Sequence, residues 1–479
     1  MIRTFPKDFV FGAATSAFQV EGGAREGGRG ACCWDGFLQR PDKGFDGEEA
    51  SDFFHRYRED IERSREFNLQ ALTISIAWPR IFPAPDGRVN EAGLQYYSDL
   101  IDTCLKNGIE PYVVLYHFDT PLYLFQKGDW LAQETAEAFL QYARVCFERF
   151  GSRVRHWITL KDPFTLASGQ YITGLFPPNE KFAVSKAVEM MHRMMLAHSR
   201  AVRLYKSMKL PGKIGIAHRL EAAYPIKWQP ANTLAADLED TLANEFLLDA
   251  TLAGGYRPET LRKINRILRY EGRSFVPNEA EIEVLTEAAG LTDFLGVNYY
   301  SSHFIEYYDG ENKVVHNAQG KKGTSTFAIR GIGRRIHKTE VPSTDWDWSI
   351  FPSGLYDMLL RIRDNYPAKP IFITENGIGI HEQLQDSSVQ DDRRIDYIRQ
   401  HLNAVLDAMD EGVEVKGYFI WSLMDALSWT NGYEKRYGLF YVDYETQQRY
   451  PKKSMYWYKD LAAKRIMLTV NAIQTKGVD

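Results

Sequence analysis

The sequence predicts an α/β protein folded as a closed (β/α)8 barrel, a TIM barrel, and three observations indicate this fold. Eight short apolar or alternating runs are separated mostly by stretches with apolar residues at helical spacing. Repeated strand-then-helix units are typical of a closed parallel barrel, and 479 residues fit one barrel with insertions. An open doubly wound sheet is the rival, but the glycines of residues 22–30 lack both a following helix signal and a phosphate-loop lysine. We therefore expect residues 1–479 to form a single barrel domain with long rim loops.

The eight predicted strands are short and rich in residues that suit a sheet covered on both faces. In chain order they cover residues 9–21, 72–78, 110–117, 156–162, 213–219, 293–300, 370–375 and 415–421. The seventh is typical: Pro370 precedes an Ile-Phe-Ile run that reaches Glu375, and Gly377 permits a tight exit. Amphipathic spacing predicts helices over residues 90–106, 132–150, 185–208, 352–365 and 391–409. Residues 38–47 and 308–344 are interpreted as rim insertions.

Composition excludes several classes of function. A net charge of -5 does not favour binding to nucleic acid or to an anionic membrane. No stretch of the sequence is long and apolar enough to suggest a membrane span. The first nine residues do not resemble a signal peptide, and four scattered cysteines indicate reduced thiols, so we expect a cytoplasmic protein. The cysteine spacing does not fit a zinc site. An aromatic fraction of 13% favours a cleft lined by rings.

Polar and aromatic residues gather at the carboxyl ends of the predicted strands, where barrel enzymes carry their chemistry. The set is Gln19, Glu21, Trp78, His117, Asp119, Lys161, Asp162, Asn298, Tyr300, Glu375 and Trp421. Each alone has a structural explanation, such as a helix cap or core packing. Together they suit a sugar, whose hydroxyls need polar partners and whose C–H faces lie against rings. Asn298 and Tyr300 share one side of their strand, and Tyr300 is expected to bond the carboxylate of strand seven.

The chain resembles glycoside hydrolase family 1, the retaining β-glycosidases on a (β/α)8 barrel, over most of its length. The motifs that carry the resemblance are FGAATSAFQVEG at residues 11–22, IAWPRI at 76–81, HFD at 117–119, NYY at 298–300, ITENG at 373–377 and WSL at 421–423. The resemblance implies that Glu375 is the nucleophile and that a carboxyl group on strand four, here Asp162, is the acid/base. It implies no metal and no organic cofactor.

The loop after strand eight resembles the phosphate loop of the family branches that hydrolyse 6-phospho-β-galactosides and 6-phospho-β-glucosides. In that loop the residues at Ser428, Lys435 and Tyr437 bind the sugar 6-phosphate. Relatives that take unphosphorylated sugars usually have Glu at the position of Ser428, and its charge would repel a phosphate dianion. Trp429 is the form associated with the galactoside branch. The expected partner is a small phosphorylated β-glycoside; homo-oligomerisation is left open.

A second aromatic residue is assigned from the same resemblance. Trp348 lies where the family has an aromatic platform for the leaving group, with core packing as an equal alternative.

Three positions depart from the family pattern, all in the catalytic centre. Strand four has Lys161 and Asp162 where the family has Asn and Glu, and Thr73 replaces an Arg. The shorter Asp162 is expected to widen the carboxyl pair beyond the ~5–5.5 Å of retaining enzymes, and Lys161 to lower its pKa. One hypothesis is that Lys161 supplies the missing cation to Glu375.

These departures leave the activity open between alternatives. We expect an active but impaired 6-phospho-β-glycosidase. The alternative is a catalytically silent or disabled barrel that still binds a phosphosugar. A Schiff-base lyase that uses Lys161 is a distant third.

Overall fold

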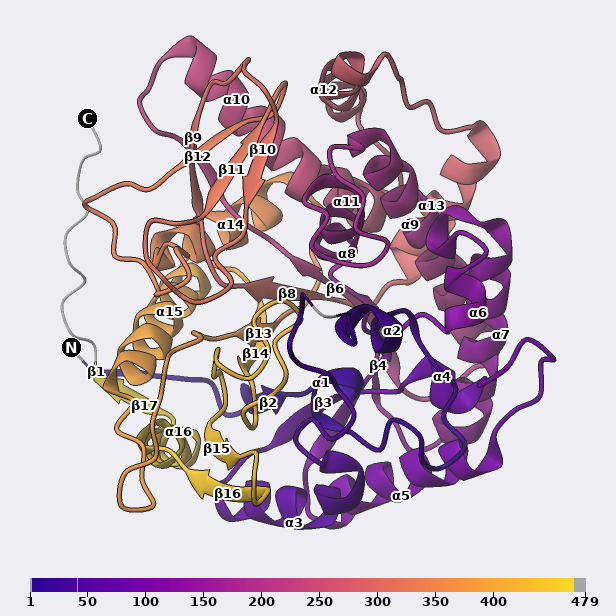
Figure 1. Ribbon diagram of the computed structural model, residues 1–479, viewed down its shortest axis with the longest axis vertical. Coiled ribbons are helices and arrows are strands. Elements are labelled where there is room, and N and C mark those ends of the chain that lie inside the picture. Colours follow the sequence, from indigo (N-terminus) through magenta and orange to yellow (C-terminus); the bar gives the residue numbers. More distant parts are fainter. Residues whose placement is uncertain (1, 41, 469–479) are drawn as a thin grey trace.

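A closed barrel of eight parallel strands forms the centre of the computed structural model, which describes residues 2–40 and 42–468 (Figure 1). Around the barrel the strands are β2 (Val10–Ala14), β3 (Ala71–Ser75), β4 (Glu110–Tyr116), β5 (His156–Lys161), β6 (Lys213–Arg219), β8 (Phe294–Tyr299), β13 (Ile371–Asn376) and β14 (Val415–Trp421). Strands β13 and β8 pair and close the ring. The predicted (β/α)8 barrel is confirmed, and each predicted strand overlaps one barrel strand.

Long helices surround the barrel (Figure 1). They include α3 (Phe53–Glu66), α5 (Glu91–Lys106), α7 (Gln133–Phe150), α9 (Val184–Ser207), α13 (Glu279–Leu291), α14 (Pro352–Asn365), α15 (Asp392–Asp410) and α16 (Lys453–Lys464). The five helices expected from amphipathic spacing are present, with ends that differ by at most one residue. Each buries an apolar stripe against the strands, as the spacing requires.

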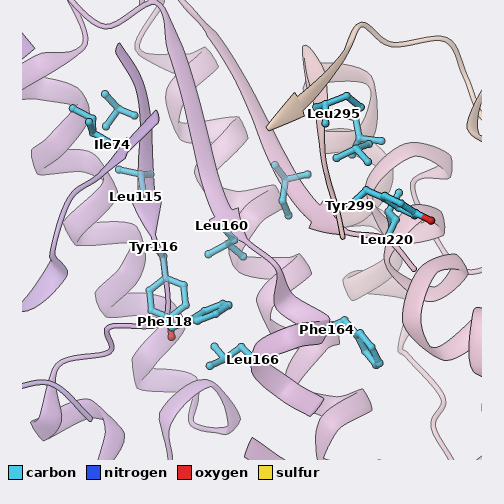
Figure 2. Close-up of a cluster of buried hydrophobic side chains, with 14 of the residues drawn as sticks. Ile74, Leu115, Tyr116, Phe118, Leu160, Phe164, Leu166, Leu220, Leu295 and Tyr299 are labelled. Atoms are coloured by element: carbon cyan, nitrogen blue, oxygen red, sulfur yellow. The ribbon is translucent and has the colours of Figure 1, made fainter. Parts of the chain in front are cut away.

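Two packed layers separate the inside of the barrel from its outside. The inner layer consists of Ala71, Tyr112, Val114, Ile158, Ala217, Phe294, Phe372 and Phe419. Outward side chains such as Leu115, Leu160 and Leu295 pack in a second cluster, together with Leu166 of α8 (Pro163–Ala167) (Figure 2). Alternation of side chains along each strand produces the two layers. Because the interior is filled, polar chemistry is confined to the ends of the strands.

The expected rim insertion at residues 308–344 contains regular structure. Its strands β10 (Lys313–Val315), β11 (Thr326–Ile329) and β12 (Gly333–Ile336) join β9 (His303–Glu306) and β7 (Ala223–Pro225) in a five-stranded sheet of order β10-β11-β12-β9-β7. The sheet is visible beside α10 (Pro230–Asp240) in Figure 1. It provides a wall next to the carboxyl ends of the barrel strands.

Two further properties concern the described residues. Cys32, Cys33, Cys104 and Cys146 are all buried and unbridged. Within residues 2–40 and 42–468, no helix is long and apolar enough to cross a membrane.

Candidate active site

Irregular pairing at the ends of β5 and β13 brings two charged side chains together. Register shifts lie between Ile158 and Lys161 on β5 and between Ile373 and Glu375 on β13. A bulge breaks the strict alternation of a strand and re-aims the side chain that follows it. Lys161 and Glu375 meet as a buried ion pair, Nζ to Oε1.

Glu375 is held at both carboxylate oxygens. Lys161 donates to Oε1, and the Tyr300 hydroxyl donates to Oε2 at 2.6 Å. The side chain is almost fully buried. Charge-assisted hydrogen bonds of this kind fix the orientation of a carboxylate. Tyr300 and Lys161 therefore both bond to Glu375, as expected from the sequence.

Asp162 follows β5 in a left-handed backbone conformation, with φ of 48°, and is the N-cap residue of helix α8. Its Oδ1 accepts a hydrogen bond of 2.9 Å from Asn298 Nδ2, and Thr374 Oγ1 donates to Asn298 Oδ1 at 2.6 Å. The amide is thus fixed with its nitrogen toward the carboxyl group. Asn298 thus bonds to Asp162, whereas Tyr300 bonds to Glu375.

Burial raises the pKa of Asp162 to about 7, and the nearby Glu375 carboxylate adds to the increase. Asn298, Lys161 and Arg219 oppose it with smaller effects. Lys161 does lower the pKa of Asp162, as expected, but desolvation outweighs the cation and the net shift is upward. Two adjacent carboxyl groups therefore differ in environment: one is paired with an ammonium group, and the other retains its proton up to neutral pH.

Gln19, His117 and Trp421 form a wall beside this pair. Gln19 Nε2 donates to the Leu427 carbonyl at 2.6 Å, while Gln19 Oε1 and His117 Nδ1 are buried with no hydrogen-bond partner among the described residues. Burial, then the charge of Lys161, holds the pKa of His117 well below its usual range, so its ring is neutral. The His117 and Trp421 rings lie 6.0 Å apart. Free polar atoms beside an indole ring suit a sugar.

The loop after β14 folds as a tight turn. Ser428 and Gly432 exchange backbone hydrogen bonds of 2.9 and 3.0 Å, and Gly432 has the positive φ of 60° that the turn requires. Trp429 stacks on Phe18 with ring centroids 5.3 Å apart and lies 6.3 Å from the His117 ring. The turn thus brings Trp429 next to the wall that contains His117.

Lys435 lies further along this loop and is only 2% exposed. Its Nζ is 3.6 Å from the centroid of the Trp348 ring, and no carboxylate in the described part of the chain forms an ion pair with it. Burial, reinforced by Arg219, holds its pKa well below the usual range. A Cβ at Gly379 would lie 2.6 Å from the Lys435 stem, so glycine is needed there. Tyr437 lies beside it, 5.5 Å from Nζ to ring centroid.

Two residues expected at the mouth serve the framework instead. Glu21 accepts hydrogen bonds from Tyr97 at 2.7 Å and from Arg80 at 3.2 Å. Trp78 stacks on Tyr142 at 5.3 Å, between the barrel and α7. The first predicted strand was too long: the chain leaves the barrel after Ala14, so Gln19 lies on helix α1 (Ala17–Val20) and Glu21 follows it.

Sequence reasoning missed Arg219, the last residue of β6. Its guanidinium lies 4.9 Å from the Trp348 centroid and 5.4 Å from that of Tyr300, and it pairs with Glu221 at 2.5 Å. The available signal was its position at a predicted strand end. Thr73 is buried on β3, and its hydroxyl has no partner among the described residues. No group of three or more His, Cys, Asp or Glu side chains within residues 2–40 and 42–468 is arranged to hold a metal ion.

Two carboxyl groups in different environments at the strand ends of a closed parallel barrel are the arrangement that glycoside hydrolases use. The comparisons with known proteins give the family. The model of glycosyl hydrolase family 1 matches residues 1–467, and the chain belongs to this family. Among curated proteins it is 50% identical over 474 residues, 99% of this chain and 100% of the relative, to a 6-phospho-beta-galactosidase of Clostridium acetobutylicum.

Solved structures of the same family share this architecture. A family 1 β-glucosidase from Thermotoga maritima is 33% identical with a TM-score of 0.87, covering 98% of this chain and 100% of that one. A family 1 β-glucosidase from Exiguobacterium antarcticum B7 is 33% identical with a TM-score of 0.88, covering 97% and 99%.

Proposed function

We propose that the protein hydrolyses 6-phospho-β-galactosides with retention of configuration and releases galactose 6-phosphate. The observation that carries the substrate class is Lys435, a buried lysine against the ring of Trp348, without a carboxylate partner in the described structure. A buried ammonium group is costly unless an anion accompanies it. A phosphate on the sugar supplies that anion, and the named relative at 50% identity supports this class of substrate.

In this proposal each contact has a defined role. Glu375, oriented by Tyr300 and Lys161, attacks the anomeric carbon and forms a glycosyl-enzyme. Asp162 gives its proton to the leaving oxygen and then takes one from the attacking water, for which a pKa near 7 is suited. No cofactor takes part in either step.

The remaining assignments concern recognition of the sugar. Gln19, His117, Asn298 and Trp421 bind the hydroxyls and the apolar face of the ring. Ser428, Lys435 and Tyr437 bind the phosphate, and Trp429 favours the axial galactose configuration. The short Asp162 side chain lowers the rate on substrates with poor leaving groups.

Turnover of 4-nitrophenyl 6-phospho-β-galactoside tests the proposal, with the unphosphorylated galactoside and the 6-phospho-β-glucoside as comparisons. We expect the phosphogalactoside to be preferred, the first product to be the β-anomer by NMR, and Glu375→Gln to abolish turnover. An α-anomer as first product would contradict a retaining mechanism. Equal rates with and without phosphate would contradict the phosphate loop.

A second candidate function follows from the ion pair itself. Both oxygens of Glu375 are already engaged, by Lys161 and by Tyr300, which favours a silent barrel that binds a phosphosugar without cleaving it. Calorimetric binding of galactose 6-phosphate without turnover of the nitrophenyl substrate would select this candidate.

A further inference from the structure

A cavity of about 170 Å3 opens between the barrel mouth and the five-stranded sheet. Its barrel side includes Arg219, Trp348 and Lys435, and its sheet side includes His303 of β9 and Arg335 of β12. Arg219 lies close enough to Asp162 to lower the pKa of that carboxyl group. Since the acid must face the leaving-group oxygen, the cavity lies on the leaving-group side of the centre.

The cationic side chains of the cavity are held from behind. Glu221 forms an ion pair with Arg219 at 2.5 Å and contacts His303 Nε2 at 2.9 Å, and it lies 3.8 Å from Arg335. Glu239 accepts from Arg335 at 2.7 Å. Neither glutamate lines the cavity, so the guanidinium groups are fixed with their carboxylates on the far side. Such preorganised cations suit a planar anion.

Hydrogen-bond donors in the cavity lack acceptors. Arg219 Nε and Trp346 Nε1 are buried and have no hydrogen-bond partner in the described residues. The one carboxylate in the lining, Asp347, already accepts from the backbone of Gly323 at 2.6 Å and of Ser325 at 3.0 Å. Unpaired buried donors indicate a ligand that brings acceptors.

We propose that this cavity is a leaving-group subsite selective for an aglycone that carries an anionic group, and that Arg219 binds that group. The proposal rests on the proposed glycosidase function and adds the charge of the leaving group to it. Trp348 lines the cavity beside an apolar part of the aglycone, and Arg219, whose guanidinium lies over that ring at 4.9 Å from its centroid, binds the anion. Arg335 makes the far wall positive.

The test compares 4-carboxyphenyl and 4-carbamoylphenyl 6-phospho-β-galactosides, which are nearly isosteric and differ in charge. The carbamoyl phenol is the better leaving group, so intrinsic reactivity opposes the expected order. We expect kcat/KM to be about tenfold higher for the carboxylate, as for one charge-assisted contact. Arg219→Met should abolish this preference and Arg219→Lys should retain part of it. Arg334→Met, a change to a half-exposed arginine of β12 outside the cavity lining, should leave it intact.

Each outcome decides the proposal. Equal rates in the wild type, or a preference that survives Arg219→Met, overturn it. An equal loss on both substrates in Arg219→Met also overturns it, because Arg219 would then act on the sugar or on catalysis. If the wild type cleaves neither substrate, the proposed function fails separately. Calorimetry with 4-hydroxybenzoate and 4-hydroxybenzamide then decides: binding of the benzoate alone, lost in Arg219→Met, supports the subsite, and no binding overturns it.

Discussion

Two buried lysines at the mouth of the barrel differ in how their charge is balanced. Lys161, at the end of β5, is fully buried and bonded to Glu375. Lys435, on the loop after β14, is buried to nearly the same extent but lies against the ring of Trp348 without a carboxylate in the described structure. The first belongs to a closed ion pair. The second has charge and hydrogen-bonding capacity left for a ligand.

This difference in charge balance assigns the two lysines to different tasks, one to the catalytic carboxylate and the other to substrate binding. An ion pair inside a protein loses hydration but is stable while both partners remain, whereas a buried lone charge is a standing cost that binding of an anion removes. Lys161 should therefore matter to folding and to the orientation of Glu375, and Lys435 to substrate affinity. The predictions below test this division, from the largest effect to the smallest.

Glu375→Gln should destabilise the protein by about 3 kcal/mol, because it leaves the Lys161 ammonium buried and unpaired. Urea unfolding measures the change. The double variant Glu375→Gln/Lys161→Met should recover most of the loss, since it removes both charges. If Glu375→Gln alone is as stable as the wild type, the pair does not contribute to the fold as described.

Asp162→Glu should raise the rate on alkyl 6-phospho-β-galactosides by about 10²-fold, the lower end of what a well-placed general acid contributes. The gain on 4-nitrophenyl substrates should be small, because that leaving group needs little protonation. Lys161 stays in place, so the orientation of Glu375 is unchanged in this comparison. Equal gains on both substrate types would mean that the reach of Asp162 is not what limits the rate.

Lys435→Met should raise KM for 6-phospho-β-galactosides by about 10- to 100-fold, the value of a charge-assisted contact to phosphate. Turnover of the unphosphorylated galactoside should not fall, and unfolding in urea should show equal or higher stability because a buried amine without a carboxylate partner in the described structure is removed. Lys186→Met, on the surface and paired with Glu180, is the matched control. A similar loss with and without phosphate would refute the division between the two lysines.

Much of this centre was accessible from the sequence because it depends on strand ends. The eight strands follow from local runs, and the two-residue spacing of Asn298 and Tyr300 placed both on one face. The sequence has Thr73 where the family has an Arg, and it has Lys161 where the family has an Asn. This exchange suggested the Lys161–Glu375 pair. The net rise in the pKa of Asp162 could not be predicted from the sequence, because it follows from burial that only the packed barrel defines. Arg219 was missed because the rings that it contacts at the barrel mouth, Tyr300 and Trp348, come from distant segments.

The final prediction concerns pH, where removal of Lys161 should produce the smallest effect. The pKa of Asp162 is raised from 3.8 to about 7, so kcat/KM on poor leaving groups should fall as pH rises through 7 and the acid loses its proton. The same shift makes this group's contribution to stability full below about pH 4 and lost as pH rises through 7. Lys161→Asn removes a cation that opposes the shift, so the alkaline limb should move upward by less than about one pH unit. A downward move of the limb in a pH–rate profile, with Lys186→Asn unchanged as the control, would show that Lys161 does not act on Asp162 through its charge.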